Sequence, residues 1–196
     1  VPAAVLDLRG GFRPPGVVEA VGAVGPVAGA TYTSLVPTQL RRLLDDPAGL
    51  AALRTFDAVL LGGAAADAAL LARARDAGVA VVTTYGMSET CGGCVYDGRP
   101  LDGVSVALED DGRIRLGGTT IAAGYHPPDP GLAVTGAFTD GWFRTADVGR
   151  LAPDGRLEVL GRIDDVIVTG GENVAPGPVE RALLDQPGVR EACVVG

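Results

Sequence analysis

The chain has 196 residues, with 16 Lys and Arg against 24 Asp and Glu, so its formal net charge is −8. Hydrophobic residues make up 47% of the chain and charged residues 20%, which is typical of a folded domain and excludes a disordered chain or a coiled coil. The arginines are scattered and form no basic stripe, so a nucleic-acid surface and an anionic membrane are both disfavoured as partners. The most apolar runs are far shorter than the roughly 20 residues that span a bilayer.

Strand and helix patterns alternate along the chain up to residue 84. This alternation predicts an α/β fold with a parallel sheet that helices cover on both faces. Pro14 and Pro37 suit helix starts, and Asp67 suits the N-cap of a further helix that ends before Gly78. The expected strands are 3–8, 31–36, 56–61 and 79–84, and the expected helices are 17–24, one from Pro37 through Leu44, and one after Asp67.

The pattern changes after Cys94 to short alternating segments joined by tight turns. The turn 110–112 joins strands at 104–108 and 113–116, and a second hairpin joins 148–151 to 156–160. A proline-rich surface loop, 127–131, lies between them. We therefore expect an antiparallel β-rich subdomain beside the parallel sheet.

Charged residues at 161–165 mark a third change and a plausible domain junction. A strand at 166–168, a turn at 170–173 and a helix from Pro178, with Val179, Ala182 and Leu183 facing inward, predict the start of a small α+β domain. We also expect a strand at 191–196. The predicted domains are 1–161 and 162–196. Because Met87 is the only methionine and both ends read as strands, the sequence is expected to be a piece of a longer protein.

Three cysteines, an odd number, predict a reducing compartment and hence a cytoplasmic protein. Cys91-Gly-Gly-Cys94 has the spacing of a redox or zinc motif. No second such motif exists and His126 is the only histidine, so a packed pair of free thiols is the preferred interpretation.

Polar and small residues follow two expected strands, where ligands gather in open parallel sheets. Gly62-Gly63-Ala64 would let a flat ring approach the backbone. The run 83–90 supplies an aromatic ring that could stack on a base, hydroxyls for phosphate and a carboxylate for Mg²⁺. These features outline a nucleotide site, and the alternative is an ordinary polar loop. Neither the phosphate-binding pattern GxxxxGK[ST] nor GxGxxG is present.

Five motifs resemble, in order and spacing, those of the acyl-adenylate-forming superfamily, which includes acyl-CoA synthetases, peptide-synthetase adenylation domains and luciferases. They are Tyr85-Gly-Met-Ser-Glu-Thr90, Gly124-Tyr125, Gly141-Trp-Phe-Arg-Thr-Ala-Asp147, Gly161-Arg-Ile-Asp-Asp-Val-Ile167 and Gly170-Gly-Glu-Asn-Val-Ala-Pro176. Within the superfamily, the segments 33–40, 86–94 and 168–174 resemble those of the o-succinylbenzoate:CoA ligases of menaquinone biosynthesis. The resemblance makes 1–161 the C-terminal part of the large AMP-binding domain and 162–196 the hinge and the beginning of the small domain.

The resemblance implies a nucleoside site built from residues far apart in the chain. Tyr85 and the adjoining Gly86 would bind adenine, with Gly63 and Ala64 lining its other side. Asp147 would accept bonds from both ribose hydroxyls, as suits a carboxylate with two oxygens.

The resemblance also assigns the phosphate and acyl-transfer roles. Ser88, where the family usually has Thr, would bond the α-phosphate, and Glu89 would bind Mg²⁺. Arg162 would contact ribose and phosphate, and Asp164 would be the hinge. The turn Gly170-Gly171-Glu172 would line the channel for CoA.

The implied activity is that of an ATP-dependent carboxylic acid:CoA ligase, which makes acyl-AMP and pyrophosphate from ATP and then a thioester from CoA. Its partners would be a small carboxylic acid, ATP and CoA, and the resemblance is compatible with a homodimer. The alternatives are a non-catalytic nucleotide-binding or assembly domain and a peptide-synthetase adenylation domain.

The sequence also departs from the family in several places. Ala146 replaces the Gly of Thr-Gly-Asp, and Arg113 replaces a usual acidic residue. The family's phosphate loop and late lysine are absent from this sequence, so we expect these 196 residues alone to bind nucleotide weakly without turnover.

Overall fold

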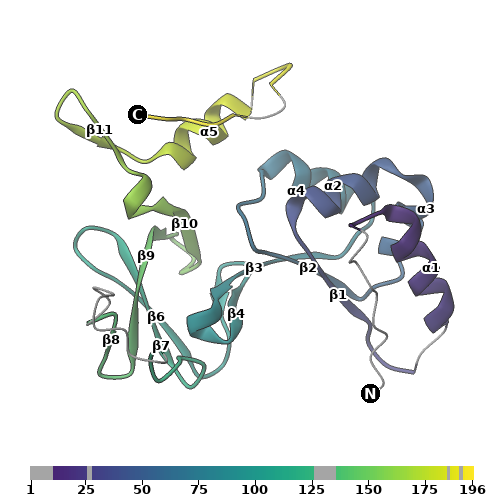
Figure 1. The fold of residues 1–196 in the computed structure, drawn as a ribbon, viewed down its shortest axis with the longest axis horizontal. Coiled ribbons are helices and arrows are strands. Elements are labelled where there is room, and N and C mark those ends of the chain that lie inside the picture. Colours follow the sequence, from purple (N-terminus) through teal and green to yellow (C-terminus); the bar gives the residue numbers. More distant parts are fainter. Residues whose placement is uncertain (1–10, 26–27, 126–135, 185, 190–191) are drawn as a thin grey trace. The chain divides into compact units, whose positions relative to one another are not determined.

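The structure, a computed structural model, describes residues 11–25, 28–125, 136–184, 186–189 and 192–196 (Figure 1). The chain divides into two compact units, Val1–Thr83 and Thr84–Gly196. The predicted strand at 3–8 and loop at 127–131 lie outside the described residues. The predicted junction at 161/162 stays a prediction.

The first unit alternates helices and strands as the sequence predicts. Strand β1 pairs with β2, and β2 with the first part of β3, both in parallel. The helix α3 was not expected, and it follows α2 after a single residue, Asp46. The elements in chain order are α1 (Pro14–Val24), β1 (Tyr32–Leu35), α2 (Pro37–Asp45), α3 (Pro47–Leu53), β2 (Ala58–Leu61), α4 (Ala68–Asp76) and β3 (Val81–Met87).

Local sequence explains where the helices begin. Asp67 Oδ1 accepts a hydrogen bond from the N–H of Leu70 over 2.6 Å, so Asp67 is the N-cap of α4 as predicted. Asp46 caps α3 in the same way, with Oδ1 2.7 Å from the N–H of Gly49. Proline in the first turn of α1, α2 and α3 needs no N–H partner there.

The helices pack on one face of the parallel strands. Val59 and Leu61 of β2 are buried, whereas the alternate residues Ala58 and Leu60 are only partly buried. In Figure 1, α2, α3 and α4 lie together on one side of β1 and β2. The expected cover on both faces is therefore wrong for the described residues. Since the strand order β1-β2-β3 runs in one direction, right-handed crossovers place their helices on the same face.

The second unit is antiparallel, as predicted. The second part of β3 pairs with β4 (Gly92–Tyr96), and β4 with β5 (Arg99–Pro100). A separate sheet has the strand order β10-β9-β7-β6, with β8 beside β9. Its strands are β6 (Val104–Leu108), β7 (Arg113–Gly118), β8 (Phe138–Thr139), β9 (Trp142–Leu151) and β10 (Leu157–Arg162).

Both predicted hairpins are present, although β9 is longer than the predicted segment 148–151 because its first half pairs with β7 and β8. Ile114 and Leu116 of β7 are fully buried and form a core with Cys94, Val95 and other apolar residues. This core holds together the strands that carry the candidate site. The fold class inferred from the sequence is confirmed.

The last elements are a hairpin and a helix. β11 (Ile167–Thr169) pairs with β12 (Glu172–Val174), and α5 (Pro176–Leu184) follows. Val179, Ala182 and Leu183, which we expected to face inward, are exposed. The reason is that strands of three residues offer no apolar face broad enough to bury that side of α5.

The strand expected at 191–196 is not formed in its described part, 192–196. The N–H of Val194 donates to the Glu180 carboxylate over 2.9 Å instead of to a neighbouring strand. Among the described helices, none is long and apolar enough to cross a membrane.

Candidate functional site

Tyr85 of β3 and Asp147 of β9 meet directly. The Tyr85 hydroxyl donates a hydrogen bond to Asp147 Oδ2 over 2.7 Å. Burial, then this bond and the charge of Asp147, raise the pKa of Tyr85, so the phenol keeps its proton and remains a donor. The adenine and ribose residues that the sequence predicts are therefore neighbours.

A bulge in β9 sets the direction of Asp147. The register of β7 and β9 shifts between Arg113 and Arg115, where Ile114 alone faces the stretch 145–147. Thr145 is buried, its hydroxyl donates to Ile114 O over 2.9 Å, and it accepts from the N–H of Asp147 over 3.0 Å. Such bulges re-aim side chains beside functional sites. Thr145 thus fixes the backbone that presents Asp147.

Arg162 joins this pair from the adjacent strand. It lies opposite Asp147 in the β10–β9 register, and its Nη1 is 3.7 Å from Asp147 Oδ1. Its Nη2 donates to Asp164 Oδ2 over 3.0 Å. The guanidinium is about half exposed, whereas the Asp147 side chain is 14% exposed. Both oxygens of Asp147 thus face a donor or a cation, and the expected hinge residue Asp164 is tied to the same arginine.

Ser88 and Glu89 lie on the short 3₁₀ turn Ser88–Thr90 that follows β3. Thr90 is buried and holds this turn, since its hydroxyl accepts from the N–H of Met87 over 2.9 Å and lies 2.7 Å from Gly92 O. The sequence analysis gave Thr90 no role. The only feature of the sequence that marked Thr90 was its position beside Glu89 in the motif 85–90.

Gly86 has a structural reason to be glycine besides its predicted place in the cofactor site. A Cβ at Gly86 would overlap the carbonyl of Gly92 on β4. The pairing of β3 with β4 also shifts register between Tyr85 and Gly86. The close approach of the two strands thus excludes any side chain at this position.

Glu89 is the residue that could hold a divalent cation. Its Oε1 accepts a hydrogen bond from the Tyr125 hydroxyl over 2.7 Å. Within the described ranges, no group of three His, Cys, Asp or Glu side chains is placed to bind a metal ion. A single carboxylate fits a Mg²⁺ that arrives bound to ATP better than a resident metal ion, and Glu89 would offer it an oxygen ligand of the kind that Mg²⁺ prefers.

The remaining predicted site residues belong to other elements of the chain. Gly63 and Ala64 follow β2 in the first unit, whereas Tyr85, Asp147 and Arg162 are in the second. Gly170 and Gly171 join β11 to β12 with φ values of 59° and 84°, as a two-residue turn of type I′ requires. Glu172 is the first residue of β12.

Cys91 and Cys94 do not form the packed pair that we preferred. Cys94 is fully buried, and this burial raises the pKa of its thiol. Cys91 is exposed and has a left-handed backbone, with φ 56°. The turn after Thr90 separates the two residues into different environments, and both are free thiols.

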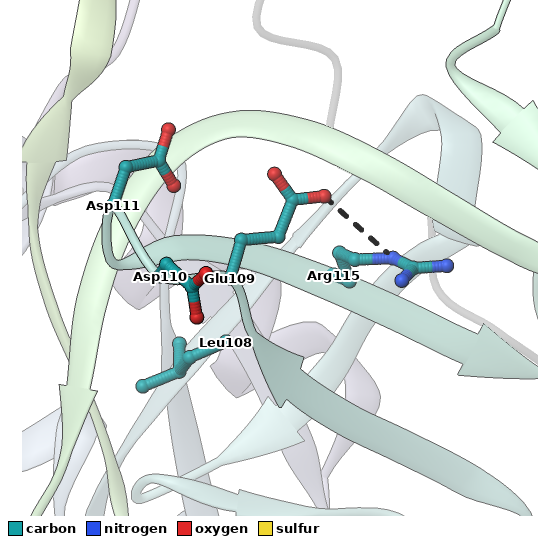
Figure 2. Close-up of a pocket in the computed structure, with 5 residues that line it drawn as sticks. All are labelled: Leu108, Glu109, Asp110, Asp111 and Arg115. Atoms are coloured by element: carbon teal, nitrogen blue, oxygen red, sulfur yellow. Dashed lines mark ion pairs between the residues drawn. The ribbon is translucent and has the colours of Figure 1, made fainter.

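A shallow depression lies at the β6–β7 hairpin, and its lining includes none of the predicted site residues. Figure 2 shows its lining, in which the Glu109 carboxylate points toward Arg115 and Asp110 and Asp111 lie at the turn. Arg144 donates to both oxygens of Glu109, to Oε1 over 2.9 Å and to Oε2 over 2.6 Å, and this lowers the pKa of the Glu109 carboxyl. Glu109 thus joins the hairpin to β9 through Arg144.

The chain is similar to known proteins in both sequence and fold. The profile of the family described as "AMP-binding enzyme" matches residues 25–126. The chain is 48% identical, over 97% of its length, to the probable 2-succinylbenzoate–CoA ligase of Mycobacterium tuberculosis, and it spans 49% of that protein's length.

Three solved structures, of two enzymes, show the same fold. The o-succinylbenzoate CoA synthetase of Bacillus subtilis with its acyl-adenylate intermediate has a TM-score of 0.78 at 31% identity, covering 95% of this chain and 41% of its own. The same enzyme has been solved with ATP and a magnesium ion, with a TM-score of 0.77. The amide bond synthetase McbA of Marinactinospora thermotolerans has a TM-score of 0.82 at 30% identity and covers 95% and 42%. The family match spans more than half of the chain and includes the turn with Ser88 and Glu89, so this chain belongs to the AMP-binding enzyme family.

Proposed function

We propose that this chain is the nucleotide-binding part of an ATP-dependent carboxylic acid:CoA ligase whose acid is o-succinylbenzoate. The observation that carries the proposal is the convergence of Tyr85, Asp147 and Arg162, which three different strands supply. An aromatic ring, a carboxylate and a guanidinium match the base, the ribose diol and the phosphate of AMP.

The nucleoside would bind to Tyr85 and Asp147 without breaking their contact. Tyr85 presents its ring to adenine while its hydroxyl occupies one acceptor position of Asp147 Oδ2. An ionised carboxylate has about four acceptor positions, so Asp147 retains room for two ribose hydroxyls. In this proposal Gly63, Ala64 and Gly86 complete the adenine site.

The phosphates would meet Ser88, Glu89 and Arg162. Attack of the acid carboxylate on the α-phosphorus expels pyrophosphate and concentrates negative charge on the phosphate oxygens. The Ser88 hydroxyl and the Arg162 guanidinium would stabilise that charge by hydrogen bonding, and Mg²⁺ held at Glu89 would neutralise part of it. The resulting acyl-AMP has a good leaving group, which the acid itself lacks.

The second half-reaction would use the residues beyond 161. The CoA thiol attacks the acyl carbon and AMP leaves, which forms the thioester. We place the hinge at Asp164, between a large-domain portion at 1–161 and the start of the small domain at 162–196, and the CoA channel at Gly170, Gly171 and Glu172. The contact of Arg162 with both Asp147 and Asp164 supports this assignment, because it links the nucleotide site to the expected hinge.

The proposal also specifies which carboxylic acid is activated and which molecule accepts the acyl group. The 48% identity to the M. tuberculosis protein supports o-succinylbenzoate and CoA. Likeness to the amide bond synthetase supports a second candidate, in which an amine rather than CoA accepts the acyl group. The free cysteine thiols support our prediction that the enzyme is cytoplasmic. The net negative charge supports our prediction that it has no nucleic-acid partner. A homodimer is a prediction that light scattering tests.

Pyrophosphate exchange tests the first half-reaction. The complete protein that the gene encodes is incubated with Mg-ATP, labelled pyrophosphate and o-succinylbenzoate, and we expect acid-dependent label in ATP. Exchange with another acid but not with this one would overturn the substrate assignment. Thioester formation with CoA, compared with amide formation with an amine, then separates the two acceptors. A protein that binds ATP but supports no exchange with any acid would favour the non-catalytic alternative.

A further inference from the structure

Gly124-Tyr125 resembles one of the family's motifs, but the proposed function assigns it no role. Tyr125 is 47% exposed, yet two defined contacts hold its side chain. Its hydroxyl donates to Glu89 Oε1 over 2.7 Å, and its ring meets the ring of Phe138 edge-on, with centroids 5.3 Å apart and planes at 74°. This geometry is a favourable one for an aromatic pair.

The aromatic contact continues to a buried anchor. The ring of Phe138 in β8 lies 4.8 Å from that of Phe143, which is 5% exposed in β9. β9 is also the strand that carries Asp147. The chain of rings therefore connects Glu89 to the same strand that holds the ribose residue.

A backbone hydrogen bond also joins the segment before Tyr125 to Glu89. The N–H of Ala122 donates to the carbonyl of Glu89 over 2.9 Å. The segment 122–125 thus contacts both the main chain and the side chain of Glu89.

We propose that Tyr125 is a positioning residue that orients the Glu89 carboxylate toward Mg²⁺. The inference rests on the proposed function, in which Glu89 binds the Mg²⁺ of Mg-ATP. Tyr125 occupies one acceptor position of Oε1 and thereby fixes the direction in which the carboxylate meets the cation. Groups that hydrogen-bond a metal ligand fix its rotamer, and their loss typically costs about 10- to 100-fold in metal affinity.

The test compares Tyr125→Phe with wild type in the complete protein. This change keeps the ring contact with Phe138 and removes only the hydroxyl. ATP binding is measured by calorimetry over a series of free Mg²⁺ concentrations, a readout that needs no turnover. We expect Tyr125→Phe to raise the Mg²⁺ concentration for half-maximal ATP affinity by about 10-fold. Tyr32→Phe, the same change at an exposed tyrosine of β1, should leave it unchanged.

Two further variants make the outcome unambiguous. Glu89→Gln should shift the Mg²⁺ dependence at least as far as Tyr125→Phe. Phe138→Leu, which loosens the ring but keeps the hydroxyl, should shift it in the same direction by less, even if Tyr125→Phe unfolds. A shift with Glu89→Gln but none with Tyr125→Phe or Phe138→Leu would overturn this inference alone. No shift with Glu89→Gln, or no ATP binding by wild type, would overturn the metal role and the proposed function with it.

Discussion

The Tyr85 hydroxyl lies 2.7 Å from Asp147 Oδ2, although 62 positions separate the two residues in the chain. Tyr85 belongs to the sheet of β1 to β5, and Asp147 belongs to the sheet of β6 to β10. This bond links the two sheets at the point where we place the nucleoside.

A double-mutant cycle measures the strength of that link. Tyr85→Phe and Asp147→Asn should each destabilise the protein, and the double variant should lose less than the sum. We expect a coupling energy of about 1.5–3 kcal/mol, since the acceptor is charged and mostly shielded from water. Urea unfolding gives the four free energies. The exposed pair Arg150–Glu158, 2.6 Å apart, is the control and should couple by less than about 1 kcal/mol.

Replacing Asp147 should also weaken ATP binding. Asp147→Ala removes the acceptor of the ribose hydroxyls, and we expect a loss of about 1.5–3 kcal/mol in binding free energy. Calorimetric titration of the complete protein with ATP checks this. Asp140→Ala, an exposed turn position with φ 52°, controls for loss of charge away from the site. Unaltered ATP affinity in Asp147→Ala would remove Asp147 from the ribose site.

Gly86 provides a test of the backbone at the start of the site. Gly86→Ala places a Cβ against the Gly92 carbonyl, so we expect destabilisation of about 1–3 kcal/mol or more. The control is Gly22→Ala in α1, where no atom lies within 4 Å of the new Cβ. That change should stabilise the protein by about 0.5–1 kcal/mol, because Gly weakens a helix interior. Urea unfolding that gave both variants the same sign would contradict the close approach of β3 and β4.

Alkaline titration tests the Tyr125–Glu89 contact without any ligand. The pKa of Tyr125 is raised from 10.0 to about 12, chiefly by its bond to Glu89. Because the pKa of Tyr125 is higher in the folded than in the unfolded protein, its hydrogen bond to Glu89 stabilises the fold fully below pH 10. This stabilisation is lost as the pH rises through about 12. Ultraviolet absorption of tyrosinate follows the titration, with Tyr125→Phe identifying the band. Glu89→Gln should bring the pKa of Tyr125 down, and an unchanged value there would contradict the contact.

Local sequence predicted most of the helices and strands. Asp67 begins α4 as its capping role requires, and the turn residues at 110–112 join β6 to β7. Periodicity could not show which face of the sheet is covered, since that depends on the order in which strands pair. Periodicity also led us to expect that Val179 and Leu183 of α5 are buried, whereas both are exposed. Helical spacing shows that the two residues share a face, but it does not show what packs against that face.

The sequence by itself determined the family and the types of side chain in the site, because five motifs kept their order and spacing and the profile match agrees with them. It could not determine their contacts. Tyr125 and Thr145 had no task in the sequence analysis, and both bond site residues or the backbone that holds them only after β7, β8 and β9 assemble. Tertiary structure decided these contacts, because a hydrogen bond needs two groups within about 3 Å. Distance along the chain does not measure that separation.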